Sequence, residues 1–122
     1  QAESEVIRLR VGEFKDTETF HRGSGQAAIY SGPGGSYLLR LENLDVTNGP
    51  ALHVYLSLHA DPESADDVKR PGYLDLGKLK ENRGNQSYPI PAVTDISTFN
   101  SVVIYCKPFA VVFSVSTLGD AA

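Results

Sequence analysis

Cys106 is the single cysteine of this 122-residue chain, and it ends a dense apolar run that begins at Ser101. One cysteine cannot form an internal disulfide, a CxxC motif or a four-cysteine zinc site. Any chemistry at Cys106 is therefore that of a lone thiol, which is oxidised to a sulfenic acid or forms a mixed disulfide with a partner. The alternative is a small hydrophobic residue of a β-core, the usual place of a free cysteine. The sequence leaves both interpretations open.

Four residues are candidates to support chemistry at Cys106. Lys107 follows it and can stabilise a thiolate near the end of a strand. Tyr105 precedes it and points to the opposite face of the same strand. His21 and His53 are distant in the sequence, and either can approach the thiol only through the fold. The chain has six tyrosines in all, which either line a ligand surface or pack across strands.

A metal site is an alternative for the acidic segment that contains Asp61, Glu63, Asp66 and Asp67. Their carboxylate oxygens are the ligands that Ca²⁺ prefers, but the spacing is not that of an EF-hand. An acidic loop that is simply solvated explains the same residues.

No cofactor is predicted, and the sequence restricts the haem proteins that the chain can resemble. Without methionine, Met/His ligation of haem is excluded, and without CxxCH so is covalent attachment of the c type. Non-covalent haem, held by two histidines or by histidine and cysteine, stays an alternative. The sequence has no nucleophile and base at a recognised spacing, so it gives no indication of an independent enzyme.

The composition indicates one globular domain and limits its partners. The net charge is −4 with acidic and basic residues interspersed, so the basic stripe typical of nucleic-acid binding is missing. No apolar run approaches the roughly 20 residues that span a bilayer. The chain contains no methionine and begins with a short polar stretch, which favours an exported protein after signal-peptide removal, although an excised domain fits as well.

The elements that must position these residues are strands, because the apolar period is two almost throughout. In residues 52–59, leucine and valine alternate with histidine, tyrosine and serine. Further strands are predicted at 6–11, 26–30, 37–44, 73–76, 86–90, 101–106 and 110–118. We expect an all-β domain over 6–118, a single antiparallel β-sandwich or flattened barrel of about eight to nine short strands. Residues 1–5 are expected to be a disordered tail and 119–122 a C-terminal tail.

Several segments in order resemble the DM-thirteen (DM13) family, which is described as an electron-transfer domain. The matching segments are Gly12-Glu13-Phe14, His21 with Ser24-Gly25, Gly49 to Ser57, Leu76 to Lys80, Gly84 to Pro91, and Ser101 to Phe109 continuing to Phe113. Any one of these motifs is weak, whereas the ordered set covers nearly the whole chain.

The resemblance implies an extracytoplasmic β-domain with a redox or electron-transfer role through the cysteine at the position of Cys106. The 122 residues contain neither of the membrane and DOMON domains that accompany the family in animals, so we expect the electron donor or acceptor to be a separate redox or membrane protein. The competing hypothesis is a non-catalytic binding or adhesion module at the cell surface, in which Cys106 is a core residue.

Overall fold

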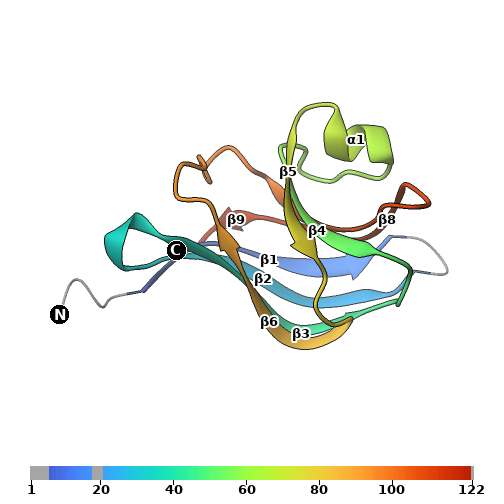
Figure 1. The fold of residues 1–122 in the computed structure, drawn as a ribbon, viewed down its shortest axis with the longest axis horizontal. Helices are drawn as coiled ribbons and strands as arrows, with labels where there is room; N and C mark the ends of the chain where they lie inside the picture. Colours follow the sequence, from blue (N-terminus) through green and yellow to red (C-terminus); the bar gives the residue numbers. More distant parts are fainter. Residues whose placement is uncertain (1–5, 18–20, 122) are drawn as a thin grey trace.

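The computed structural model describes residues 6–17 and 21–121, and within them the chain is almost entirely β-structure (Figure 1). It forms nine strands and two short helical segments in this described part. The strands are β1 (Ile7–Asp16), β2 (Gly23–Ser31), β3 (Tyr37–Val46), β4 (Leu52–Ser57), β5 (Tyr73–Lys78), β6 (Arg83–Ile90), β7 (Ser101–Cys106), β8 (Val111–Thr117) and β9 (Gly119–Asp120). A 3₁₀ turn, η2, spans Pro33–Gly35, and a single α-helix, α1, spans Ala65–Lys69.

The strands form one antiparallel sheet in the order β5-β4-β7-β8-β1-β2-β3-β6, with β9 beside β1. β5 and β6, the two ends of this order, are consecutive in the chain, so the loop between them bridges the two edges and the sheet nearly closes on itself. This confirms the expected all-β class, and the closure makes the molecule a flattened barrel.

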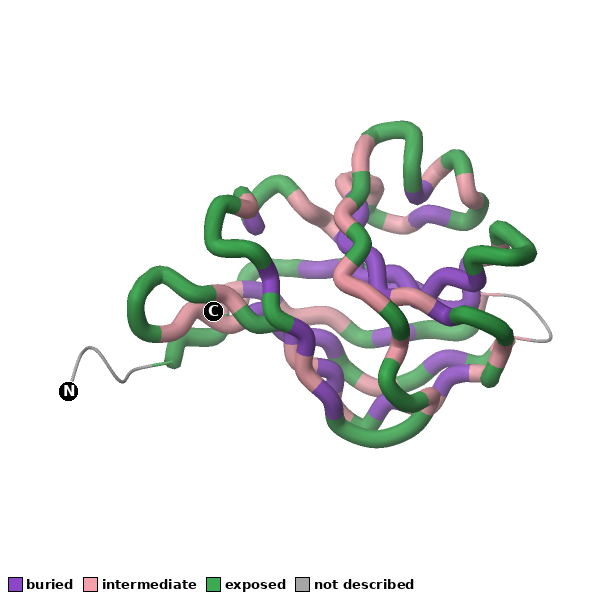
Figure 2. Tube along the Cα trace, viewed as in Figure 1, coloured by how far each residue is buried: buried purple, intermediate pink, exposed green. Residues whose placement is uncertain are grey.

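The inside of the barrel is the main hydrophobic core. It is built from the inward-facing residues of every long strand, and Figure 2 shows burial concentrated along the strands. The largest fully buried aliphatic side chains in it include Ile29, Leu39, Leu41, Leu56 and Ile104. Period-two alternation explains this core, because a half-turn per residue sends every second side chain inward.

Arg10 seals one end of this core with its guanidinium group. The residue is 8% exposed, and the group donates hydrogen bonds to four carbonyl oxygens, which belong to Ile96, Phe99, Leu118 and Gly119. A buried charge with so many acceptors is satisfied, and it holds the C-terminal residues against β1.

A second, smaller core lies on the outside of the sheet. Residues 58–72, which we call the covering segment, leave β4 and include α1, which stands outside the barrel in Figure 1. Val68 of α1 is fully buried, and its carbonyl oxygen accepts a hydrogen bond from Ser57 Oγ at 2.9 Å. The helix has only five residues and would not persist alone, so this contact and the Ser64 N-cap hold it in place.

The predicted strands are all present. Several are longer than predicted, whereas the strands predicted at 52–59 and 110–118 are shorter, spanning Leu52–Ser57 and Val111–Thr117. The segment expected as a C-terminal tail contributes β9, and the tail expected at 1–5 lies outside the described residues. The main surprise is on the outer face of β4 and β7. Tyr55 and Ser57 do point outward, as alternation predicts, but the covering segment buries both. None of the helices in the described part of the chain is long and apolar enough to cross a membrane.

Candidate functional site

Cys106 is fully buried at the end of β7. Its side chain belongs to the inner core, between Leu52 of β4 and Val111 of β8 in the strand register. The thiol lies 3.3 Å from the carbonyl oxygen of Pro50, to which Sγ donates a weak hydrogen bond. The next residue, Lys107, is exposed and begins a turn. The thiol is therefore inaccessible in this conformation, although the next residue in the chain is already at the surface.

Two of the candidate supporting residues meet at Asp75 on the outer face of the sheet. His53 Nδ1 lies 3.0 Å from Asp75 Oδ1, and Lys107 Nζ lies 3.6 Å from Asp75 Oδ2. Cys106 points to the inner face, so neither pairing involves the thiol. A third candidate, His21, stacks on Phe113 with ring centroids 4.1 Å apart. The structure thus gathers His53 and Lys107 around a carboxylate that the sequence analysis did not single out.

A β-bulge in β5 explains why Asp75 can reach His53. Between the pairs Tyr55↔Asp75 and His53↔Lys78, β5 has one residue more than β4. Gly77 provides the extra residue at φ 110°, a conformation that side-chain-bearing residues rarely adopt. Its amide donates a 2.8 Å hydrogen bond to Asp75 Oδ1, the same oxygen that faces His53. The bulge therefore fixes the orientation of the carboxylate.

Next to this carboxylate lies a set of three tyrosine rings, which we call the tyrosine stack: Tyr73, Tyr55 and Tyr105. The ring of Tyr55 lies 4.9 Å from that of Tyr105 and 4.9 Å from that of Tyr73, measured between centroids. His53 meets Tyr55 edge-on at 6.3 Å. The four rings come from the adjacent strands β5, β4 and β7 and form a continuous aromatic path.

The burial of the stack is graded from the surface inward. Tyr73 is 43% exposed, whereas Tyr55 and Tyr105 are each 1% exposed beneath the covering segment. The hydroxyl of Tyr105 is buried, and it makes no hydrogen bond within the described part of the chain. Lys69 of α1 holds its Nζ over two of the rings, 5.7 Å from the centroid of Tyr73 and 5.2 Å from that of Tyr105.

The electrostatics of the site follow from this packing. Burial, and then the negative charge of Asp75, raises the pKa of the Tyr55 hydroxyl to about 12. Burial also acts to raise the pKa of Asp75. The hydrogen bonds from His53 and Gly77 and the nearby positive charges outweigh it, so this pKa lies below its usual value. At neutral pH the site therefore contains a neutral phenol beside an ionised carboxylate.

The acidic residues of the covering segment are spread over different partners. Asp61 pairs with Lys15 of β1 at 2.7 Å, and Asp66 pairs with Arg70 at 3.8 Å. Asp67 Oδ2 accepts a hydrogen bond from the amide of Glu63. Among residues 6–17 and 21–121, no three His, Cys, Asp or Glu side chains gather as metal ligands would.

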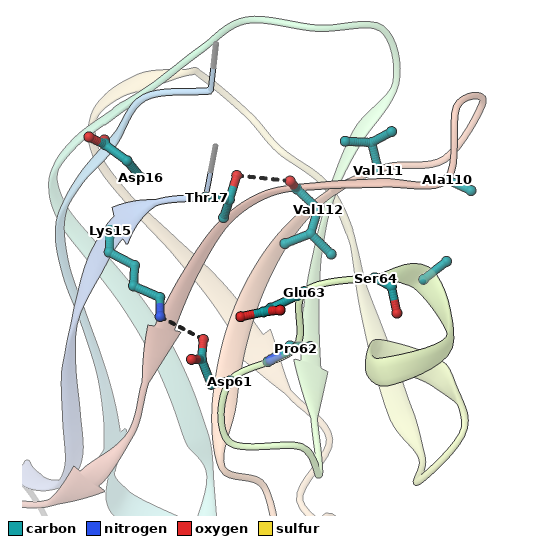
Figure 3. Close-up of a pocket in the computed structure, with 11 residues that line it drawn as sticks. Lys15, Asp16, Thr17, Asp61, Pro62, Glu63, Ser64, Ala110, Val111 and Val112 are labelled. Carbon is teal, nitrogen blue, oxygen red and sulfur yellow. Dashed lines mark hydrogen bonds and ion pairs between the residues drawn. The ribbon is translucent and has the colours of Figure 1, made fainter. Parts of the chain in front are cut away.

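The Lys15–Asp61 pair lies in a polar hollow of about 540 Å³ between β1, β8 and the covering segment (Figure 3). Thr17, Glu63 and Ser64 also line it. Thr17 Oγ1 donates to the carbonyl oxygens of Val112 and Phe113, so the proton of this hydroxyl is already used in hydrogen bonds within the wall of the hollow. Neither Cys106 nor the tyrosine stack lines this hollow, which is therefore separate from the site above.

The sequence alone did not indicate that one site contains Asp75, Tyr73, Tyr55 and Lys69. One signal was available for part of it. Residues 101–106 are apolar on both faces, which is typical of a strand that is covered on both sides. That pattern predicts a cover over the outer face of β7. It does not say which residues of the neighbouring strands share that face, because strand order is not visible in a single sequence.

Comparison with known proteins identifies the domain family. The family model described as electron transfer DM13 matches residues 13–118, which is nearly the entire chain and includes Cys106 and the tyrosine stack. No curated protein and no solved structure matches the chain. The matched residues include the end of β1 and all of β2 to β8, so the match concerns the barrel as a whole. The chain belongs to the electron transfer DM13 family.

Proposed function

We propose that this domain is an extracytoplasmic electron-transfer module that exchanges electrons with a separate redox protein and uses Cys106 as its thiol redox group. Membership of the electron transfer DM13 family supports the general role. The exported location rests on the resemblance to a family of extracytoplasmic domains. The proposal requires no cofactor bound to this chain.

The main support for a redox role of Cys106 is its position at the end of β7. The sulfur is fully buried, but residues 107–110 form an exposed turn directly after it. Unfolding of a strand end costs much less than global unfolding, because few buried contacts are lost. Separation of the end of β7 from Pro50 and from its strand partners Leu52 and Val111 would expose the thiol while the rest of the barrel stays folded.

The chemistry in the opened state is thiol–disulfide exchange. The sulfur of Cys106 attacks one sulfur of a disulfide on the partner, and the bond between the two partner sulfurs breaks. Cys106 is oxidised in the new mixed disulfide, and the displaced partner sulfur is reduced. The proton of the Cys106 thiol ends on that displaced sulfur, so atoms and electrons balance.

The test is the rate at which glutathione disulfide and a water-soluble maleimide modify Cys106 in the native domain. We expect both reactions to be slow compared with a free thiol but faster than global unfolding, which is measured separately by stopped-flow dilution into denaturant. Cys106→Ser provides the blank. Modification that proceeds only at the global unfolding rate would contradict the proposal. Cys106 would then be a core residue, and the binding or adhesion module would be the better explanation.

Location has its own test, independent of the thiol. The natural gene product, tagged at its C-terminus, is expressed in its host cell, and the cell is fractionated. We expect the tag in the secreted or envelope fraction. Recovery of all tagged protein with a cytosolic marker would contradict the extracytoplasmic part of the proposal.

A further inference from the structure

The tyrosine stack connects the surface of the domain with its interior. Tyr73 is partly open to solvent, and its ring leads through Tyr55 to Tyr105, each step at a centroid separation of 4.9 Å. Tyr105 lies beneath the covering segment on the face of β7 opposite Cys106. Phenol rings at such separations are close enough for an electron to pass between them, whereas no reagent can follow the same path.

We infer that the tyrosine stack is a one-electron relay, and that the His53–Asp75 pair takes up the proton released when Tyr55 is oxidised. The inference rests on the proposed electron-transfer function of the domain, but it does not depend on thiol chemistry at Cys106. The partner it requires is a protein with a metal centre that accepts one electron at a time.

The reaction balances as a coupled transfer of one electron and one proton. The oxidised metal centre of the partner accepts one electron through Tyr73, which is a one-electron reduction of the metal. Tyr55 loses that electron together with its hydroxyl proton and becomes a neutral tyrosyl radical. The proton passes to the imidazole of His53, whose ring meets that of Tyr55 edge-on with centroids 6.3 Å apart. The resulting imidazolium is stabilised by the Asp75 carboxylate that lies 3.0 Å from Nδ1. Return of the electron from the reduced metal centre and of the proton from His53 restores the phenol.

Charge placement favours Tyr55 as the residue on which the radical rests. The ammonium group of Lys69 lies over the rings of Tyr73 and Tyr105, where a positive charge opposes removal of an electron. Tyr55 instead lies opposite Asp75 in the strand register, and the negative charge of this carboxylate favours loss of an electron from the ring and stabilises the protonated imidazole of His53. The middle of the stack is therefore the easiest position to oxidise.

The hydroxyl of Tyr105 is a second, independent observation that points to phenol chemistry. It is buried without a hydrogen-bond partner among the described residues, which costs about 1–3 kcal/mol relative to a satisfied group. Phenylalanine would fill the same space between Tyr55 and Val68 without that cost. A phenol at this position contributes nothing to packing that a benzene ring would not, so packing alone does not explain why the third ring of the stack is a tyrosine.

The test uses the purified domain and a photo-oxidised ruthenium tris-bipyridine complex as a soluble one-electron acceptor. Flash absorption and EPR spectroscopy follow the tyrosyl radical. In the unmodified chain we expect a long-lived radical on a buried ring. Tyr55→Phe should shorten its lifetime at least about tenfold, and Tyr73→Phe should slow its formation by a similar factor. Both variants keep the aromatic ring, so the fold is retained.

Tyr30→Phe and Tyr37→Phe are matched controls, because these tyrosines are half-buried and lie outside the stack. Each should leave the lifetime of the radical within about twofold of the unmodified value. A long-lived radical that persists in Tyr55→Phe, or that is lost in either control, would overturn the relay.

Two further variants separate the relay from its proton acceptor and from the thiol. Asp75→Asn should slow radical formation and increase the kinetic isotope effect, which is the ratio of the rates of radical formation in H₂O and D₂O. An isotope effect equal to that of the unmodified chain would show that the His53–Asp75 pair does not accept the proton. Cys106→Ser should abolish exchange with glutathione disulfide and leave the radical lifetime unchanged. Loss of the relay and loss of the thiol function are therefore distinguishable.

Discussion

Tyr105 and Tyr88 allow the same substitution to be made at two buried hydroxyls with opposite expected effects. The two residues are 1% and 2% exposed. The hydroxyl of Tyr88 donates to Gln86 Oε1 at 2.5 Å and accepts from the amide of Lys80 at 2.8 Å. The hydroxyl of Tyr105 makes no hydrogen bond within the described residues. Replacement by phenylalanine removes two satisfied bonds in one case and an unsatisfied polar atom in the other.

The expected magnitudes follow from these contacts. Tyr88→Phe leaves the Lys80 amide without a partner, so we expect the free energy of unfolding to fall by about 1–3 kcal/mol. Tyr105→Phe should raise it by up to about 1 kcal/mol, because the unfolded chain hydrates the hydroxyl that the fold leaves unpaired. For a domain of this size the melting temperatures of the two variants should differ by roughly 10 °C.

Urea unfolding and calorimetry of both variants beside the unmodified chain measure this difference. Equal m-values show that the comparison concerns the folded state rather than the compactness of the unfolded one. If Tyr105→Phe destabilises the domain as much as Tyr88→Phe, the Tyr105 hydroxyl has a partner. The argument that a phenol is retained there at the expense of stability would then be wrong.

Three further predictions concern the residues that hold the barrel and the site together. Arg10→Met should lower the free energy of unfolding by at least about 3 kcal/mol in urea titrations, because it leaves four carbonyl oxygens without their donor; a loss below 1 kcal/mol would mean that water replaces the guanidinium. Gly77→Ala should lower the free energy of unfolding by about 1–3 kcal/mol through backbone strain alone, because an added Cβ meets no atom within 4 Å. An unchanged melting temperature would contradict the positive φ at the bulge. Asp75→Asn should cost about 1 kcal/mol at pH 7, and because the pKa of Asp75 is lowered on folding, the difference from the unmodified chain should disappear as the pH falls from about 4 through that lowered pKa. A difference that persists at pH 2 would show that the carboxylate charge is not the cause.

The alternation of apolar residues predicted the barrel because it is a local property of each strand. It predicted all of β7, at residues 101–106, and all of β4, with two residues too many at the end of β4. It also gave the correct inward direction for Cys106, on the same face as Val102 and Ile104. The apolar neighbours in residues 101–106 favoured burial of the thiol, but the sequence left a core residue and a reactive thiol both open.

The partners of the site could not be predicted, because they depend on which strands are neighbours. Lys107 was considered with Cys106, its neighbour in sequence, but alternation sends the two side chains to different faces. Its partner Asp75 comes from β5, whose position beside β4 follows from the strand order. Tyr55 was expected on an outward face and is found there. What the sequence did not indicate is that residues 58–72 fold over it.

The near closure of the barrel has a consequence for how the domain behaves at high concentration. β5 and β6 are the two edges of the sheet, and unpaired backbone groups along an edge recruit strands from other molecules. Here each edge is interrupted. Pro89 removes an amide donor from β6, and the bulge at Gly77 twists β5 away from the flat geometry that strand addition requires. The same glycine that orients Asp75 thus also protects the domain against edge-to-edge aggregation.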